Sequence, residues 1–564
     1  MNLGRILIAA IFCAASSFAQ LTAEQKLADF NDLAATFDKN YGPYEWKRDA
    51  IGFDLLRIGP WLDRVKATRT DLEFYEVMSK YVASLNDAHD TYSLPSLFFA
   101  RLGFNVDIYD GKVLIDNITR ALLPLTTYPF QIGDELVSVD GRSVEEWITE
   151  FSQFRSAANT RSTRRFAAGS ITSRSQSVIP STGLLGDSAA VVIRRDGGNI
   201  ENYTIPWTKS GLPLTTVGPV PSPNALLKKQ TAAKPGADSS DYMAPLRRLW
   251  NCSLSETGTV LNFGAVGPIF RLPANFVQRL GKVNTDEFYS GIFQAGGYNI
   301  GFIRIPSFSP NNTTLAINQF INEIVFFQQR TDGLIIDVMR NPGGSVFYDN
   351  LLLSVVHPTI FRSIPFQVRS TSGWVASFSS ALTSAKAQGA ESWVIALYGL
   401  LYNDLVQANK ESRGMTGPLP LDYVTIDRLP FDDGRGNKLV YSKPIMTLID
   451  EFSASGADVF PATIQDNQRG VLFGWRTMGA GGSVNGYSAG VFSEGSTTLT
   501  ESLMVRRFSI NTAGEYPVSP YIENIGVRPD IQADYMTRDN LINGGKTFVD
   551  AFSAAMVEHI KKTQ

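Results

Sequence analysis

Two short apolar runs, each followed by a turn of small residues, constrain the fold of this chain most. Residues 333–338 read Gly-Leu-Ile-Ile-Asp-Val and precede a turn at 340–344 that contains Asn-Pro-Gly-Gly. Residues 443–450 read Lys-Pro-Ile-Met-Thr-Leu-Ile-Asp, and a helical pattern begins soon afterwards, at Ser455. Successive apolar positions are typical of parallel strands that are buried on both faces. The runs therefore predict an α/β core over residues 296–564, with a polar insertion at 362–437.

The rest of the chain divides into regions with different patterns. Apolar residues spaced by three and four predict a helical N-terminal region over residues 20–94. Short alternating strands, with turns at Gly133-Asp134 and Asp140-Gly141, follow over residues 95–210 and resemble a PDZ domain that carries an insertion. Residues 211–295 are rich in Pro, Ser and Gly in places, which indicates a linker and the rim of the next domain. The predicted fold class is α/β plus β.

The first residues predict export. Arg5 precedes an apolar run at 6–15 and a small residue at Ala19, which is the pattern of a secretory signal peptide over residues 1–19. We therefore expect a periplasmic or extracellular protein. The apolar run is shorter than the roughly 20 residues that cross a bilayer, so we expect no stable membrane anchor. Cleavage leaves only Cys252, which excludes an intrachain disulfide and favours a buried, apolar role for this cysteine.

Composition argues against several functional classes. Lys and Arg total 51 against 54 Asp and Glu, and the net charge of −3 argues against a nucleic-acid partner. The sequence has no Cys/His cluster with zinc-ligand spacing and no phosphate-binding loop, so we expect no metal and no cofactor.

The helix that begins near Ser455 suits nucleophilic catalysis. A serine at a helix start lies beside free backbone N–H groups, and the amide of Gly456 can bind a developing oxyanion together with one from the Gly343-Gly344 turn. The alternative is that Ser453 and Ser455 only cap the helix, as serine often does.

These segments, in this order, resemble the C-terminal processing (tail-specific) serine peptidase family. They are residues 332–344 and 448–458, with the PDZ-like region before them and Glu523-Asn524-Ile525-Gly526 after them. The resemblance implies a crotonase-like α/β peptidase core, in which the Asn-Pro-Gly-Gly turn lies beside the nucleophile corner. It implies Ser455 as the nucleophile, Gly456, Gly343 and Gly344 as the oxyanion hole, and a protein or peptide as the substrate.

The usual base of that family is a lysine shortly after the nucleophile helix, and it is absent here. Its position is Ala480, and no lysine occurs at 444–545. One of the three histidines, His89, lies at a helix-to-strand junction, which resembles the branch with the tricorn core protease and the chlamydial protease-like activity factor. In that branch a histidine from the N-terminal region is the base. The resemblance therefore implies His89 as base and Glu523 as third residue, with Glu515 as the alternative.

Three questions stay open from the sequence. Asp466 lies eleven residues after Ser455, three helical turns on, and is either a support for the site or an ordinary polar helix end. The run Arg161, Arg164 and Arg165 is interpreted as a solvated face of the insertion, with docking of an acidic substrate tail as the alternative. The PDZ-like region either recognises a substrate tail or, with its groove filled by the insertion, braces the catalytic region; we favour bracing.

The sequence therefore predicts a secreted serine endopeptidase that forms an acyl-enzyme on Ser455 with His89 as the base. The missing lysine favours the alternative of a catalytically inactive relative that binds a peptide or an apolar ligand.

Overall fold

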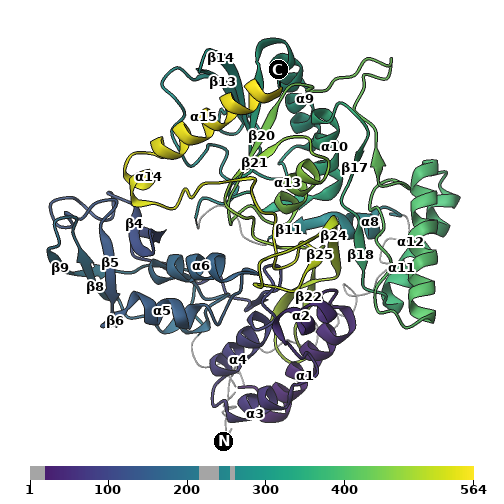
Figure 1. Cartoon of the computed structure of the whole chain (residues 1–564). Helices are drawn as coiled ribbons and strands as arrows, with labels where there is room; N and C mark the ends of the chain where they lie inside the picture. The colour runs from purple at the N-terminus through teal and green to yellow at the C-terminus, as the bar shows by residue number, and fades with distance from the viewer. Residues whose placement is uncertain (1–19, 215–240, 255–260, 564) are drawn as a thin grey trace, which may run out of the picture.

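The computed structural model describes residues 20–214, 241–254 and 261–563. The predicted signal peptide at residues 1–19 lies outside these residues. Figure 1 shows the N-terminal helices at the bottom, the PDZ-like region at the left, and the catalytic core at the centre and top. A pair of helices from the insertion projects at the right.

The core is built on one seven-stranded sheet with the order β12-β13-β14-β15-β20-β21-β26. From β14 to β26 the strands pair in parallel, while β12 and β13 pair antiparallel. The strands are β12 Val277–Leu280, β13 Tyr289–Ala295, β14 Tyr298–Arg304, β15 Gly333–Asp337, β20 Ile445–Ile449, β21 Val471–Gly474 and β26 Ile531–Gln532. The sheet therefore begins within the stretch that the sequence indicated as linker and rim.

Helices cover both faces of this sheet. On β15, Leu334 and Ile336 pack toward one apolar cluster and Ile335 packs toward another, as the period of a strand requires. The first cluster includes residues of α9 Thr313–Arg330, α10 Val346–Val356 and α13 Gly456–Asp466, and the second includes residues of α15 Lys546–Thr563. The α/β core predicted from the two apolar runs is confirmed.

The insertion at 362–437 adds small strands and a helical hairpin. Helix α11 Ser372–Ala387 packs along α12 Ser392–Lys410. The short strands of this region and its partners are β17 Phe361–Arg362, β18 Phe366–Val368, β19 Asp427–Arg428, β24 Ser502–Ile510 and β25 Ser519–Tyr521. Because β18 pairs with β24, the insertion is tied to the C-terminal part of the core.

The PDZ-like region is a separate sheet in which β3 is an edge strand. Its elements are β3 Phe104–Tyr109, β4 Lys112–Ile118, β5 Glu135–Val139, β6 Arg142–Ser143, β8 Ser188–Arg194, β9 Ile200–Pro206 and the helices α5 Val144–Phe151 and α6 Thr160–Thr172. Helix α6 packs against β3 and α5, and Arg165 of α6 forms an ion pair with Asp107 of β3. PDZ domains add a peptide strand at such an edge, and here α6 packs beside it. A smaller sheet joins β2 Phe99–Arg101, β7 Ser173–Ser175 and β10 Thr208–Ser210.

The N-terminal helices are fastened to the core near the site. They are α1 Ala23–Asn40, α2 Tyr44–Ile51, α3 Gly59–Ala67 and α4 Asp71–Ala83. Thr22 and Thr70 form capping boxes at the starts of α1 and α4. After α4, the strand β1 Tyr92–Ser93 joins a sheet with β23 Ser496–Thr500 and β22 Val484–Ser488 of the C-terminal half. The segment between α4 and β1, which contains His89, is thereby held against the core.

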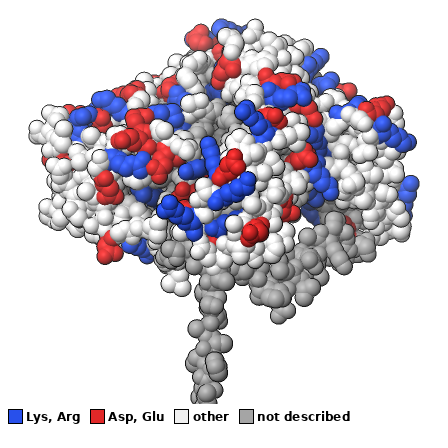
Figure 2. All heavy atoms as spheres, turned by 90° about the horizontal axis from the view of Figure 1, so that it is seen from below, with Lys and Arg blue, Asp and Glu red and all other residues white. Residues whose placement is uncertain are grey.

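The surface carries mixed charge. On the face seen in Figure 2, basic and acidic side chains alternate rather than gather into one patch of a single sign. Within the described part of the chain, every helix is too short or too polar to cross a membrane.

Candidate active site

Ser455 lies at the junction between a parallel strand and a helix. It follows β20 and immediately precedes α13, with φ 61° and ψ −109°. This conformation is strained for a residue with a Cβ, and such strain is typical of sites where the surrounding structure holds a functional side chain in place. The Ser455 N–H donates to Asp458 Oδ2 at 2.7 Å, which fixes the serine against the first turn of the helix.

The glycine turn packs directly against this corner. The Ala454 N–H donates to the Asn341 carbonyl at 3.0 Å, and the Asn341 side chain donates to the Ile305 carbonyl at 2.9 Å. Gly343 has φ 91°, and a Cβ at this residue would lie 2.7 Å from the Gly456 nitrogen. Only glycine allows this approach, because both the conformation and the space exclude a side chain.

The predicted oxyanion donors are not equivalent. The Gly343 N–H donates to Asn341 Oδ1 at 2.8 Å, so it is engaged within the turn. Gly456 has no Cβ, but a Cβ built on it would lie 3.1 Å from the Gly344 nitrogen. The backbone amides of Gly344 and Gly456 are therefore close neighbours. The geometry therefore favours Gly344 and Gly456 as a donor pair and gives Gly343 a role in shaping the turn.

His89 contacts the serine from the N-terminal region. Its Nε2 lies 2.7 Å from Ser455 Oγ, although the two residues are 366 positions apart. Both side chains are buried. Burial lowers the pKa of His89 to about 4; the Asp87 carboxylate opposes this shift and the Lys47 ammonium adds to it. The imidazole is therefore neutral at pH 7 and able to accept a proton.

Glu523 lies near the site without touching the imidazole. Its carboxylate forms an ion pair with the Lys47 ammonium and accepts the Gly481 N–H at 2.8 Å. Among the described residues, His89 Nδ1 has no hydrogen-bond partner. Burial and the Asp87 carboxylate raise the pKa of Glu523 to about 8, against the pull of Lys47.

The Glu523 pair instead holds the turn that carries His89. Lys47 Nζ donates to the Asn86 carbonyl at 2.8 Å and to Asn524 Oδ1 at 2.8 Å. Asn524 Nδ2 also donates to the Asn86 carbonyl at 2.8 Å. This contact was not expected from the sequence, because nothing in the helical pattern around Lys47 distinguishes it from a surface lysine.

The other predicted acids lie elsewhere. Glu515 is exposed and pairs with Arg476 and Arg528, so the choice between the two glutamates favours Glu523. Asp466 is the last residue of α13, at the opposite end of the helix from Ser455, and pairs with Arg506. The structure therefore does not bring Asp466 to the site.

Asp458 is a second residue that the sequence analysis did not identify. It is buried and accepts N–H groups from Ser455, from Gly479 at 3.0 Å and from Ala480 at 3.1 Å. Burial raises its pKa to about 6. An acid three residues after a serine at a helix start is a capping-box pattern, so the sequence carried a signal for this contact.

Ala480 occupies the place expected for a lysine and is fully buried. It belongs to an apolar cluster with Ala88 and Ala454, the neighbours of His89 and Ser455. At this corner the space beside the serine is therefore apolar, and the imidazole is the nitrogen base that contacts the hydroxyl.

The arginine run is not a solvated face, contrary to the sequence interpretation. Arg165 is 1% exposed and pairs with Asp107 and, at 2.9 Å, with Glu451. Arg161 pairs with Glu451 and with Asp534, at 2.7 Å for the second pair. Arg161 and Arg164 are both partly exposed, and Arg164 pairs with Glu145 at 2.8 Å. Through the ion pairs of Arg161 and Arg165 with Glu451, helix α6 holds the segment between β20 and Ser455 in place.

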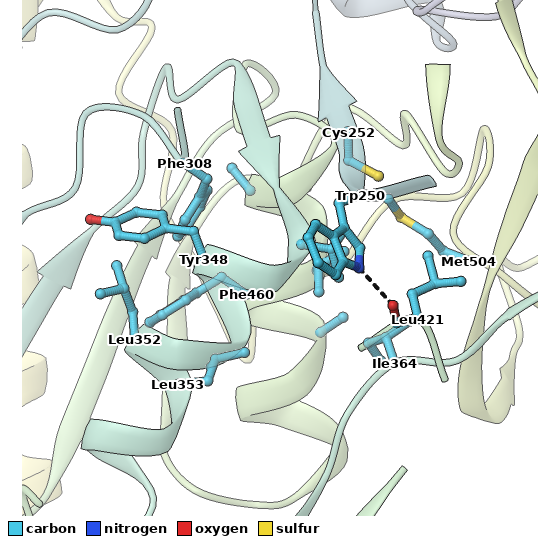
Figure 3. Close-up of a cluster of buried hydrophobic side chains, with 14 of the residues drawn as sticks. Trp250, Cys252, Phe308, Tyr348, Leu352, Leu353, Ile364, Leu421, Phe460 and Met504 are labelled. Atoms are coloured by element: carbon cyan, nitrogen blue, oxygen red, sulfur yellow. Dashed lines mark hydrogen bonds between the residues drawn. The ribbon is translucent and has the colours of Figure 1, made fainter. Parts of the chain in front are cut away.

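In this structure the site is covered by part of the chain itself. Strand β11 Asn251–Ser253, which follows α8 Ala244–Trp250, pairs with β16 Gly343–Ser345, so that Cys252 lies opposite Gly344. The Cys252 thiol is hydrogen-bonded to the Ser455 side chain, and burial raises its pKa well above the usual range. Cys252 is buried, as predicted. Figure 3 shows Trp250 and Cys252 seated on the apolar core, with the Trp250 indole N–H donating to the Leu421 carbonyl at 2.6 Å.

No metal centre accompanies these groups: within the described ranges, three His, Cys, Asp or Glu side chains nowhere gather as ligands for an ion.

Comparison with known proteins identifies the family. The model of peptidase family S41 matches residues 299–533. The catalytic core that this model matches belongs to peptidase family S41. The chain is a serine-type peptidase, and residues 99–212 match the model of a PDZ domain. The family resemblance and the predicted fold are confirmed.

Relatives of this S41 peptidase occur in Chlamydia. A protein of Chlamydia pneumoniae is 26% identical over 635 residues, covering 100% of this chain and 96% of the relative. A protein of Chlamydia muridarum is 25% identical over 576 residues, covering 94% and 92%. Among solved structures, mature CPAF complexed with lactacystin superposes with a TM-score of 0.73 at 22% identity, covering 96% of this chain and 99% of that chain. This last likeness shows the fold.

Replacing Arg165 with Gln should impair this S41 peptidase through the Ser455 corner. The change leaves Asp107 and Glu451 without their buried partner, which typically costs about 3–5 kcal/mol of stability. It also frees the segment before Ser455, and a small displacement of a catalytic group can cost about 10²-fold in turnover. We expect kcat for peptide hydrolysis to fall about 10- to 100-fold at a temperature where the variant is folded.

The matched control is Arg164→Gln, one residue away, since its exposed pair with Glu145 contributes only about 0–1 kcal/mol. Unchanged kcat in folded Arg165→Gln would show that the ion pair stabilises the fold without positioning the serine.

Proposed function

We propose that this peptidase cleaves peptide bonds through an acyl-enzyme on Ser455, with His89 as the general base. The observation that carries the proposal is the 2.7 Å contact between His89 Nε2 and Ser455 Oγ at a corner flanked by backbone amides. This contact favours catalysis over the alternative of an inactive relative that only binds a peptide or an apolar ligand. A serine hydroxyl is a poor nucleophile without a base, and the imidazole supplies one.

The steps follow from the geometry. As Ser455 Oγ attacks the carbonyl carbon of the substrate, His89 Nε2 takes the hydroxyl proton. The carbonyl oxygen gains negative charge and is stabilised by the N–H groups of Gly456 and Gly344. The imidazolium then gives its proton to the leaving amine, and the acyl-enzyme remains. Water hydrolyses the ester in the second half, with His89 taking a proton from the water and returning one to Ser455.

Glu523 is a positioning residue in this proposal. Its pair with Lys47 fixes the Asn86 carbonyl and so the turn that presents the imidazole. Lysine at 480 is not required, because His89 is the base in this proposal.

The substrate is a protein or peptide in an extended conformation. Extended chains bind to sheet edges through backbone hydrogen bonds, and the edge beside the oxyanion turn is that of β16. Strand β11 occupies this edge. A substrate that pairs with β16 must therefore displace β11 before it reaches Ser455.

Ser455→Ala should lower kcat for peptide hydrolysis by about four to six orders of magnitude. The nucleophile and its base act as a unit, so removing one member costs about as much as removing all of them. The melting temperature should change little, since one buried hydroxyl is lost. Ser453→Ala is the control two residues away. The Ser453 Oγ donates to the Val338 carbonyl at 2.8 Å, so its loss should lower the melting temperature while kcat stays within about tenfold of the wild-type value. Wild-type turnover in Ser455→Ala would exclude the assignment.

The pH dependence tests the base. Protonated imidazole cannot accept the serine proton, so activity falls as the pH drops through the pKa of His89. Since burial lowers this pKa to about 4, the acid limb of kcat/KM should lie well below the 6.5 of a free imidazole. Initial rates between about pH 3 and pH 8 measure it. An acid limb at or above about 6.5 would contradict a buried His89 as the base.

We also infer that the enzyme acts after export, as a periplasmic or extracellular protein. The signal-peptide pattern at residues 1–19 supports this. Protein recovered from the exported fraction of cells that express the full chain should begin at Gln20 by N-terminal sequencing. A product that keeps residues 1–19 and stays in the cytoplasm would contradict export.

A further inference from the structure

An unpaired carboxyl group is buried close to the oxyanion turn. Asp349 of α10 is 0% exposed, and neither of its side-chain oxygens has a hydrogen-bond donor within the described residues. The side-chain oxygen of the next residue, Asn350, is also buried, again without a donor in the described part of the chain. Buried polar atoms are almost always paired, so these oxygens call for a partner that carries several N–H groups.

Asp349 lies one helical turn from the strand with which Cys252 pairs. Cys252 lies opposite Gly344 of β16, and the residue after Gly344, Ser345, caps α10. Asp349 is four residues beyond Ser345, which is about 6 Å along the helix axis. Burial, and then the Asp349 carboxylate, raise the pKa of the Cys252 thiol, so the two side chains are within electrostatic reach of each other. A longer side chain in the place of Cys252 is therefore able to reach the Asp349 carboxyl.

Strand β11 pairs with β16 in the way that an extended substrate would. The Leu254 N–H donates to the Pro342 carbonyl at 2.9 Å, and hydrogen-bonded pairs alternate along an antiparallel ladder. Cys252 and Gly344 are therefore the next hydrogen-bonded pair, in which the Cys252 carbonyl faces the Gly344 N–H. A Cβ on Gly343 would clash with this carbonyl oxygen. Because the Gly344 N–H is one of the two oxyanion donors, Cys252 lies where the substrate residue with the attacked carbonyl belongs.

The basic group near Asp349 is already paired. Arg428 forms an ion pair with Asp422 at 2.7 Å, and Asn350 Nδ2 donates to Asp422 Oδ2 at 2.9 Å. Burial, with the Asp422 carboxylate, raises the pKa of Asp349 well above its usual range. An added cation would favour the ionised carboxylate, since an opposite charge nearby lowers the pKa of an acid. The local charge therefore favours a positively charged partner for Asp349.

Apolar side chains complete the surroundings. Cys252, Trp250 and Met504 belong to one buried apolar cluster, which Figure 3 shows. The Trp250 ring stacks on Phe347 of α10, with the ring centroids 4.7 Å apart. Lysine and arginine side chains place an aliphatic stem along apolar surface and a charged group at its end. A basic side chain therefore matches both the apolar cluster and the carboxyl group beyond it.

We propose that Asp349 selects substrates with lysine or arginine at the residue whose carbonyl Ser455 attacks. The inference rests on the proposed peptidase function and names the side chain that this site takes. The stem of the basic residue replaces the Cys252 side chain, and its charged end pairs with Asp349 and donates to Asn350 Oδ1. Lysine and arginine both carry several N–H donors and no acceptor, so either one pairs these oxygens.

Binding of blocked pentapeptides to the full-length Ser455→Ala protein tests the proposal without turnover. The probes are acetyl-Ala-Ala-X-Ala-Ala-amide with lysine, arginine or norleucine as X, and norleucine has the stem of lysine without its ammonium. By calorimetric titration, the lysine or the arginine peptide should bind at least about tenfold more tightly than the norleucine peptide. A preference below tenfold for both basic peptides overturns the proposal, and so does a lack of binding by all three peptides.

Asp349→Asn, made in the same protein, removes the charge and keeps the shape of the side chain. It should bring the basic peptides to within about threefold of the norleucine peptide. The melting temperature should not fall, because the carboxyl has no described partner to lose. Asp427→Asn, at an exposed acid of the insertion, is the control and should keep the preference. A tenfold preference that survives in Asp349→Asn overturns the proposal, and if this variant does not fold, the comparison of the three peptides decides.

The protein with Ser455 intact provides the second readout. It should cleave the preferred peptide directly after the basic residue, which mass spectrometry of the products identifies. Cleavage at another bond overturns the proposal. A basic preference in binding without hydrolysis of any peptide would support the pocket and contradict the Ser455 mechanism, so the two failures are distinguishable.

Discussion

Parallel pairing of β15 with β20 is the interaction on which the site depends. Leu334 lies opposite Ile445 and Asp337 opposite Leu448, so both strands end at the same edge of the sheet. The Asn341–Gly344 turn and the Ser455 corner follow these two ends and meet there. In open parallel sheets, ligands bind at the carboxyl ends of the strands for this reason. Apolar residues on both faces of each strand hold the register, because a slip by one residue would exchange the two faces.

The second constraint is that the imidazole in contact with Ser455 comes from a distant part of the chain. Sheet pairing of β1 with β23 brings the His89 segment to the core, and the Thr91 N–H donates to Thr498 Oγ1 at 3.1 Å. A buried pair, Lys47 and Glu523, then fixes the turn. A buried ion pair of this kind contributes little net stability but strongly penalises any arrangement in which one partner is absent. Such a pair therefore suits a site whose geometry must be unique.

The sequence predicted the core and the Ser455 corner because local patterns carry them, whereas the contact of His89 with Ser455 was expected only from a family resemblance. Apolar runs at 333–338 and 445–449 gave the strands, and the small residues that follow gave the corner. The sequence did not point to Lys47 or Asp458, and it suggested a solvated face for Arg165. The roles of Lys47 and Arg165 depend on partners far away in the sequence. An isolated Arg165 on a polar helix is indistinguishable from a surface residue until Asp107 and Glu451 are placed beside it. The pairing of β11 with β16 beside Ser455 is likewise a tertiary contact, which no local sequence pattern predicts.

The most direct test of the account is to identify the residue that becomes acylated. Under conditions in which the protein hydrolyses peptides, a fluorophosphonate should modify a single residue, and peptide mapping by mass spectrometry should locate it at Ser455. The same treatment of His89→Ala should give little modification, because the hydroxyl then lacks its base. Modification at Cys252 or at another serine, or equal modification of Ser455 in the His89→Ala variant, would contradict a mechanism built on the His89–Ser455 contact.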